Sequence, residues 1–312
     1  MNVDRSELGC VVHAAPGNRL ANCPADEVRA LLREHGYVQF LGFAATPEEF
    51  AEFTNGFGRC ADTRTVHYPE GGEALGFHAE DAYNPYRPDS LWFLCVFEGS
   101  DGGAPTGVVD GVELLNALPE EWRRFCLANT LRFDRHWPAE LWREALGAEA
   151  KAELDTVLSA IPGTAHRFLS DDELFVSCES PIVTRTPAGA DSFSNTMLQA
   201  VTEPPFYGMS LGTGEPVPAE LSAMVQTMAL ERERHVGWSA GQVAVIDNLR
   251  MMHRRAEYSG VDRDLRARHC EDLYGSVLPD DSTPVAAWAK SLLQGDEGYP
   301  SKVGPLSASH AS

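Results

Sequence analysis

The chain has 312 residues, of which 46 are acidic and 25 are basic, so its formal net charge is −21. This excess of negative charge argues against nucleic acid or an anionic membrane as a partner, because both are bound through clustered lysine and arginine. The composition, 43% hydrophobic and 23% charged, is that of a globular protein that can bury a large core.

The N-terminal residues 1–19 carry polar and charged side chains without the apolar stretch of a secretory signal, and no run of 18 apolar residues follows. Seven cysteines are scattered singly, without a C-x-x-C pair, at positions 10, 23, 60, 95, 126, 178 and 270. This pattern predicts a cytoplasmic protein with no membrane partner, in which the cysteines are reduced and form no structural disulfide.

The first predicted elements are a helix, a strand and a second helix. Residues 24–34 carry apolar side chains along one side and are followed by Gly36, which ends the helix. Residues 37–41 have the composition of a strand. A capping box at 46–49, with proline in the first helical position, then predicts a helix that stops at Gly58.

The middle of the chain is less regular. A buried strand is predicted at 90–97, and a second strand near 106–109. Helices are predicted at 120–128 and around 148–160. Residues 130–200 otherwise mix short apolar runs with Pro, Gly and Ser, which favours a lid insert with several short strands.

The last third of the chain begins with a helical pattern at 219–235. A short buried strand is predicted at 242–246 and a strand pair at about 263–273. The tail at 300–312 contains Ser and Gly and is expected to be loose.

These elements together are helices that flank many short strands, without a βαβ rhythm or a glycine-rich phosphate loop. The sequence therefore predicts an all-β core with flanking helices, a β-sandwich or jelly roll, within one domain that spans residues 1–312.

Three residues suggest a metal site. His78 and Glu80 are two positions apart, so in an extended segment they point to the same face, and His253 follows a predicted strand far downstream. Two imidazoles and one carboxylate form the facial triad of non-haem Fe(II) oxygenases, which leaves three positions open for a cosubstrate and dioxygen. The spacing alone is weak evidence, because a surface histidine is the simpler interpretation.

Further segments carry a resemblance to one family. They are Phe77-His-Ala-Glu-Asp-Ala-Tyr-Asn-Pro-Tyr-Arg-Pro-Asp-Ser-Leu, Gly102-Gly-Ala-Pro-Thr-Gly-Val-Val-Asp-Gly with Leu118-Pro119, and Gly241-Gln-Val-Ala-Val-Ile-Asp-Asn-Leu-Arg-Met-Met-His. With these motifs the chain resembles the Fe(II)/2-oxoglutarate-dependent dioxygenases of the taurine dioxygenase superfamily, in particular the clavaminate synthase-like branch. The resemblance covers about residues 36–275 and is weak over 130–200.

The resemblance implies a double-stranded β-helix with Fe(II) held by His78, Glu80 and His253, and no catalytic residue beyond these ligands. It also implies 2-oxoglutarate as cosubstrate, which dioxygen oxidises to succinate and carbon dioxide.

The far carboxylate of 2-oxoglutarate needs an arginine. The family pattern implies Arg263, or Arg266 if the register is slipped, and Arg268 is also near. The second arginine of the family's R-x-x-x-R pattern falls on Ala267, which is a departure. Thr106 matches a family threonine whose hydroxyl shares this carboxylate.

The sequence says less about the reaction type and the substrate than about the cofactors. A carboxylate at Glu80 disfavours halogenation, because related halogenases carry Gly or Ala there. Hydroxylation is expected, while desaturation, epoxidation and cyclisation use the same cofactor chemistry. The branch implies a free amino acid or an amino-acid-derived intermediate of specialised metabolism. Candidate substrate contacts are Asp81, Tyr83, Arg87 and Asn195, although a solvated loop is the simpler interpretation for the region around Asn195.

Two other classes of function remain open from the sequence. One is a zinc hydrolase that uses the same three ligands, although H-E-x-x-H is absent. The other is a non-catalytic binding protein of the same fold. The expected partner is a small molecule, and the sequence does not predict the oligomeric state.

Overall fold

A computed structural model describes residues 1–60, 64–66, 74–99, 105–202, 208–256, 263–274 and 282–294. The predicted loose tail at 300–312 lies outside these residues, as does the Gly102-Gly103 motif. Within the described part of the chain, no helix has the length and apolar character needed to cross a membrane.

The larger of two facing sheets has eight strands. They are β1 (Asn2–Arg5), β2 (Cys10–His13), β3 (Tyr37–Leu41), β4 (Arg59–Cys60), β5 (Arg64–Val66), β7 (Ser90–Phe97), β16 (Val243–Asp247) and β18 (Asp264–Glu271). Their order is β1-β2-β3-β16-β7-β18-β4, and β5 also pairs with β18. The pairing of β2 with β3 is parallel, and the others are antiparallel.

The smaller sheet has the order β15-β8-β17-β6. Its strands are β6 (Leu75–His78), β8 (Thr106–Asp110), β15 (Arg234–Val236) and β17 (Met251–Arg255). One apolar cluster, named here the interior cluster, contains residues from both sheets and therefore lies between them: Tyr37, Leu91, Phe93, Cys95, Val108, Val236, Trp238, Ala244, Ile246, Met251, Leu265 and Ala267.

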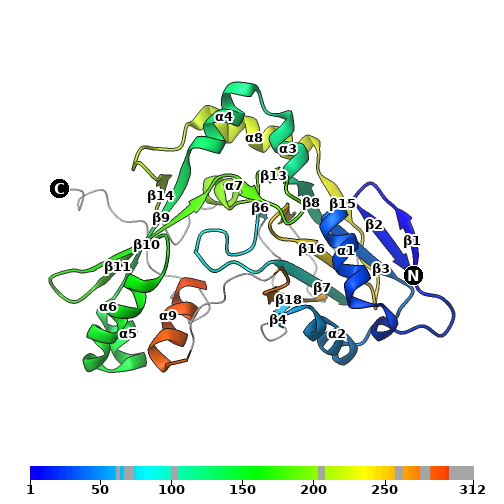
Figure 1. Ribbon diagram of the computed structural model, residues 1–312, viewed down its shortest axis with the longest axis horizontal. Coiled ribbons are helices and arrows are strands. Elements are labelled where there is room, and N and C mark those ends of the chain that lie inside the picture. The colour runs from blue at the N-terminus through cyan, green and yellow to red at the C-terminus, as the bar shows by residue number, and fades with distance from the viewer. Residues whose placement is uncertain are drawn as a thin grey trace.

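Helices cover the outer faces of both sheets (Figure 1). In β7, successive side chains alternate, so Phe93 enters the interior cluster while Trp92 packs outward. The outward side chains meet the apolar sides of α1 (Ala25–His35) and α2 (Pro47–Thr54). Over the smaller sheet lie α3 (Gly111–Ala117), α4 (Glu120–Ala128), α7 (Met197–Thr202) and α8 (Ala219–Glu231).

A third, four-stranded sheet follows the order β10-β11-β9-β14 and lies on the left of Figure 1. Its strands are β9 (Thr130–Trp137), β10 (Thr164–Phe168), β11 (Leu174–Pro181) and β14 (Gly208–Leu211), and its helices are α5 (Ala139–Leu146), α6 (Lys151–Ala160) and α9 (Pro284–Gln294). A further pair, β12 (Thr184–Arg185) and β13 (Asp191–Ser192), completes the region in which the sequence predicts a lid insert.

The predicted caps are present. Gly36 adopts a φ of 74° after α1, a left-handed conformation that glycine accepts without the steric cost of a Cβ atom. Before α2, the Thr46 side chain accepts from Glu49 N, and the Glu49 side chain accepts from Thr46 N. The strand predicted at 90–97 is β7.

Two predicted elements differ from the structure. The helical pattern at 219–235 ends at Glu231, and the chain then turns into β15, because Arg234–Val236 pairs with β8. The strand pair predicted at 263–273 is a single strand, β18, since residues 264–271 form one strand along β7, with a register shift between Asp264 and Leu265 and no turn.

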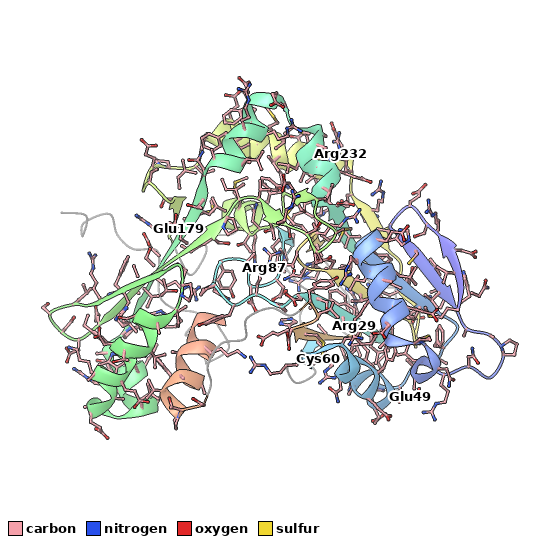
Figure 2. The ribbon with its side chains drawn as sticks, in the orientation of Figure 1. Arg29, Glu49, Cys60, Arg87, Glu179 and Arg232 are labelled. Atoms are coloured by element: carbon pink, nitrogen blue, oxygen red, sulfur yellow. A yellow bond between two sulfur atoms is a disulfide. The ribbon has the colours of Figure 1, made fainter. Side chains whose placement is uncertain are left out.

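The expectation of no structural disulfide is wrong, because Cys60 and Cys270 are disulfide-bonded. The two cysteines are 210 residues apart in the chain, but they lie directly opposite each other on β4 and β18. Figure 2 labels Cys60 close to α2. The other five cysteines are free and buried, in agreement with the prediction of reduced cysteines.

Candidate metal centre

The two histidines of the predicted triad come from neighbouring strands. His78 is the last residue of β6, and His253 lies opposite it in β17. Their imidazole ring centroids are 4.2 Å apart. Both side chains are buried, so the strand pairing brings two histidines from distant parts of the sequence into one site.

Glu80 completes this group from the turn after β6. One of its carboxylate oxygens, Oε2, lies 3.7 Å from His78 Nε2 and 3.6 Å from His253 Nε2. The ligand atoms of the three residues all lie within 4.8 Å of one another. The three predicted ligands therefore converge on one point.

Asn248 fixes the backbone of Glu80 and was not singled out in the sequence. Its Oδ1 accepts a hydrogen bond from Glu80 N at 2.8 Å, and its Nδ2 donates to Glu80 O at 2.9 Å. Asn248 is fully buried and also donates to Pro88 O. The sequence contains a signal that could have identified Asn248, because this residue belongs to the Asp-Asn pair of the family segment that ends in His253.

Hydrogen bonding and burial act on the predicted ligands. The Nδ1–H of His78 donates to Gly76 O at 2.8 Å, which turns Nε2 toward Glu80. Burial, aided by the nearby His78, lowers the pKa of His253 to about 3. Burial alone would raise the pKa of Glu80, but the neighbouring His269, His78 and His253 hold it well below its usual range. Two imidazoles and a carboxylate are a donor set that fits Fe(II).

His269 is a second residue that sequence reasoning missed. It lies on β18, and its Nε2 is 3.9 Å from Glu80 Oε1, the oxygen that does not face the His78–His253 pair. Glu80, Asp81 and His269 form a second group of ligand atoms within 4.8 Å of one another. Both oxygens of Glu80 therefore have histidine neighbours.

The predicted cosubstrate residues lie around the interior cluster. Thr106 is buried and precedes Val108, a cluster residue, by two positions in β8, so the two side chains point to the same face. Arg263 is also buried, and its charge acts on the thiol of Cys95, another cluster residue.

Arg266 and Arg268 lie elsewhere. The guanidinium of Arg266 donates to both carboxylate oxygens of Asp264 at 3.2 Å. Arg268 donates to Ala51 O at 2.7 Å and to the side chains of Thr54 and Asn55, at the end of α2. These two arginines therefore face α2, while Leu265 and Ala267 of the same strand face the interior cluster.

Two of the predicted substrate contacts lie beside the predicted metal ligands. Asp81 has a φ of 54°, an uncommon conformation for a non-glycine residue that turns the chain directly after Glu80. Its carboxylate accepts a hydrogen bond from the Tyr83 hydroxyl at 3.0 Å. The guanidinium of Arg135, from β9 of the third sheet, lies 4.9 Å from the centre of the Tyr83 ring.

The other two predicted contacts bind backbone groups. Arg87, labelled near the middle of Figure 2, donates to Asn248 O and Ser194 O. Asn195 donates to Ile182 O and accepts from Met197 N, while Ala79 N donates to Asn195 O. Asn195 therefore attaches the segment before α7 to the turn that carries Glu80, and a contact of either residue with substrate stays a prediction.

Comparison with known proteins identifies related chains. The family model "Taurine catabolism dioxygenase TauD, TfdA family" matches residues 13–269. The dapdiamide synthesis protein DdaC of Enterobacter agglomerans is 25% identical over 236 residues, which cover 68% of this chain and 70% of that protein.

Solved structures show the same fold at low sequence identity. The PvcB protein of Pseudomonas aeruginosa is similar with a TM-score of 0.58 and 17% identity, over 85% of this chain and 86% of its own. AAD-2, solved with Mn(II) and N-oxalylglycine, has a TM-score of 0.57 and 15% identity, over 86% of this chain and 97% of its own.

Proposed function

Because this chain belongs to the TauD, TfdA family of taurine catabolism dioxygenases, we propose that it hydroxylates a C–H bond of a small amino-acid-like molecule. The protein is an Fe(II)- and 2-oxoglutarate-dependent dioxygenase. The proposed substrate is a free amino acid or an amino-acid-derived intermediate of specialised metabolism. Desaturation, epoxidation and cyclisation are alternatives that use the same cofactors.

We assign Fe(II) to His78, Glu80 and His253. The observation that carries this assignment is the convergence of Glu80 Oε2 with the two Nε2 atoms at 3.6–3.7 Å. When bound, Fe(II), 2-oxoglutarate and dioxygen supply the oxidising chemistry, in which 2-oxoglutarate is converted to succinate and carbon dioxide. Hydrogen bonds from Glu80 N to Asn248 and from His78 Nδ1 to Gly76 O hold these two residues in position, and the surrounding protein keeps the site buried.

We assign the distal carboxylate of 2-oxoglutarate to Arg263 and Thr106. A buried carboxylate needs a charged partner with well-directed N–H groups, and arginine supplies them in a planar fork. The burial of Arg263, and the orientation of Arg266 and Arg268 toward α2, support Arg263 over its neighbours. Thr106 would add one hydrogen bond from its hydroxyl.

The fold that we infer is a double-stranded β-helix, within one oxygenase domain. Two sheets that enclose a shared apolar cluster, with ligands from β6 and β17 of the smaller sheet, support this inference. The third sheet would serve as the lid over the site, because Arg135 of β9 contacts Tyr83 beside the metal ligands.

Two similarities support the substrate class. DdaC is named for dapdiamide synthesis, and a PvcB structure is described as that of an Fe, α-ketoglutarate-dependent oxygenase from an isonitrile synthetic pathway. At the site, the Asp81 carboxylate and the Arg135 guanidinium both contact the Tyr83 side chain, so opposite charges lie near one side chain. Such a pair suits a zwitterion with an ammonium and a carboxylate group. A cytoplasmic location, and the absence of a nucleic acid partner, remain predictions from the sequence.

The test is a substrate screen of free amino acids and their amides. The readout is succinate release above the level without substrate, with product mass measured in parallel. A gain of one oxygen atom in the product of a substrate without a C=C bond supports hydroxylation, whereas for a substrate with a C=C bond it also fits epoxidation. A loss of two hydrogens indicates desaturation or cyclisation instead. Succinate release that Glu80→Ala retains would contradict the assignment of the site.

A further inference from the structure

Trp238 makes a buried hydrogen bond with one of the proposed cosubstrate residues. It lies in the connection between β15 and β16, and its indole Nε1–H donates to Thr106 Oγ1 at 3.0 Å. Both side chains are 8% exposed. Water therefore does not compete strongly for this bond.

This bond restricts what the Thr106 hydroxyl can do. A hydroxyl has one hydrogen to donate and two lone pairs to accept, whereas an indole N–H can only donate. The Thr106 oxygen must therefore act as acceptor toward Trp238, and its own hydrogen is directed elsewhere. Among the described residues, the Thr106 hydroxyl donates to no acceptor. The hydroxyl hydrogen is available for a ligand.

We propose that Trp238 is a positioning residue for the cosubstrate: its N–H holds the Thr106 hydroxyl in the orientation that donates to the distal carboxylate of 2-oxoglutarate. This proposal rests on the proposed function, in which Thr106 contacts that carboxylate. Without the indole N–H, the hydroxyl would rotate among several orientations, and part of the binding free energy would go into ordering it.

The ring of Trp238 has a separate packing role, which the test must keep intact. Its centroid lies 5.9 Å from that of Phe93, and Phe93 lies 5.9 Å from the His253 ring in an edge-on contact. Trp238 belongs to the interior cluster through these apolar contacts. Trp238→Phe removes the N–H while it keeps an aromatic ring against Phe93, so it separates the hydrogen bond from most of the packing.

The experiment is a double-mutant cycle on 2-oxoglutarate affinity, measured by titration calorimetry of the Mn(II)-loaded protein. Thr106→Val should weaken binding about tenfold to a hundredfold, as expected for a hydrogen bond to a charged group. Trp238→Phe should weaken it about twofold to tenfold. Because the indole acts through the hydroxyl, Trp238→Phe should add no further loss in the Thr106→Val background.

A matched control comes from Trp92. Its indole Nε1–H donates to Ser90 Oγ at 3.1 Å, a bond of the same kind on the opposite face of β7. Trp92→Phe should leave the 2-oxoglutarate affinity unchanged. Thr106→Ser keeps the hydroxyl that Trp238 orients, so it should bind 2-oxoglutarate nearly as well as the wild type, even if Trp238→Phe proves unstable.

Several outcomes would overturn the proposal. Equal affinities of Trp238→Phe and wild type would show that the indole N–H does not position the hydroxyl. Additive losses in the double variant would mean that Trp238 acts independently of Thr106, and a loss in Thr106→Ser as large as in Thr106→Val would exclude the hydroxyl. If Thr106→Val itself bound normally, the assignment of Thr106 in the proposed function would fail together with this inference.

Discussion

His253 lies directly opposite His78 in the antiparallel pairing of β17 with β6, and the imidazole rings of the two residues are 4.2 Å apart. Cross-strand neighbours of this kind are held by the sheet itself, so the histidine pair does not depend on a flexible loop. Glu80 joins them from the adjoining turn, where the Asn248 side chain hydrogen-bonds to both the backbone N–H and the backbone C=O of Glu80.

The first prediction concerns these three residues. His78→Ala, Glu80→Ala and His253→Ala should each lower turnover at least about a hundredfold, because each removes one of three metal ligands. Circular dichroism should show an unchanged fold, and metal analysis should show less bound Fe(II). His13→Ala is the control, since His13 is partly exposed and pairs with Asp4 on β1. Near-native turnover in any of the three variants would defeat the assignment.

The second prediction concerns the arginine that binds 2-oxoglutarate. Arg263→Ala should raise the 2-oxoglutarate requirement about a hundredfold or more, because a buried carboxylate without its charged partner costs about 3–5 kcal/mol. Arg266→Ala should have a small effect, since Arg266 pairs with Asp264. The dependence of succinate formation on 2-oxoglutarate concentration, measured for both variants, shows which arginine binds the cosubstrate. If Arg266→Ala raised the 2-oxoglutarate requirement strongly and Arg263→Ala did not, Arg266 would be the arginine that binds 2-oxoglutarate.

The third prediction concerns the disulfide. Without reductant, the denatured chain should show five free thiols, and reduction should bring the number to seven. Cys60→Ala should lower the free energy of unfolding by about 2–5 kcal/mol under oxidising conditions, because the bond closes a long loop in the unfolded chain. Cys60→Ala combined with Cys270→Ala should be no less stable than the single variant. Seven thiols before reduction would show that the bond does not form.

The fourth prediction uses the pH dependence of stability. Asp247 is buried, and burial raises its pKa to about 7 even though Leu249 N and the Tyr274 hydroxyl donate to it. Its unfolded pKa is about 3.9. A raised pKa means that the folded state keeps a proton which the unfolded state has already lost. The stability that this group contributes is therefore fully present below about pH 4 and is lost as the pH rises to about 7.

Asp247→Asn removes this titration. Between about pH 4 and pH 7, the wild type should lose on the order of 2–4 kcal/mol of unfolding free energy relative to the variant. Urea denaturation of both proteins at several pH values measures this difference. Parallel pH profiles of the two proteins would show that Asp247 is ionised in the folded state throughout this range.

Much of the fold could be predicted where one local signal decides it. The apolar run of β7, the capping box of α2 and the glycine after α1 act within a few residues, so the sequence predicts these elements, although α2 itself ends at Thr54, before the predicted stop at Gly58. The helix prediction was wrong at 232–235 because β15 forms through its pairing with β8, which no local pattern shows. The third sheet was expected only as a lid with short strands for the same reason.

The candidate site likewise contains residues that could be predicted from the sequence and residues that could not. His78, Glu80 and His253 could be predicted because the motif and the family pattern name ligand residues directly. The contacts of His269 with Glu80 and of Trp238 with Thr106 could not be predicted, since they depend on where β18 and the β15–β16 connection lie. The disulfide was missed because Cys60 and Cys270 meet only through the pairing of β4 with β18.

The visible spectrum of the protein with Fe(II) and 2-oxoglutarate in the absence of oxygen tests the assignment of the metal centre most directly. We expect a weak lilac charge-transfer band when 2-oxoglutarate is added to the Fe(II)-loaded wild type. The band should be lost in Glu80→Ala and His253→Ala, and Arg263→Ala should need far more 2-oxoglutarate to produce it. No band in the wild type at saturating 2-oxoglutarate, or an undiminished band in Glu80→Ala, would contradict the assignment of the metal centre.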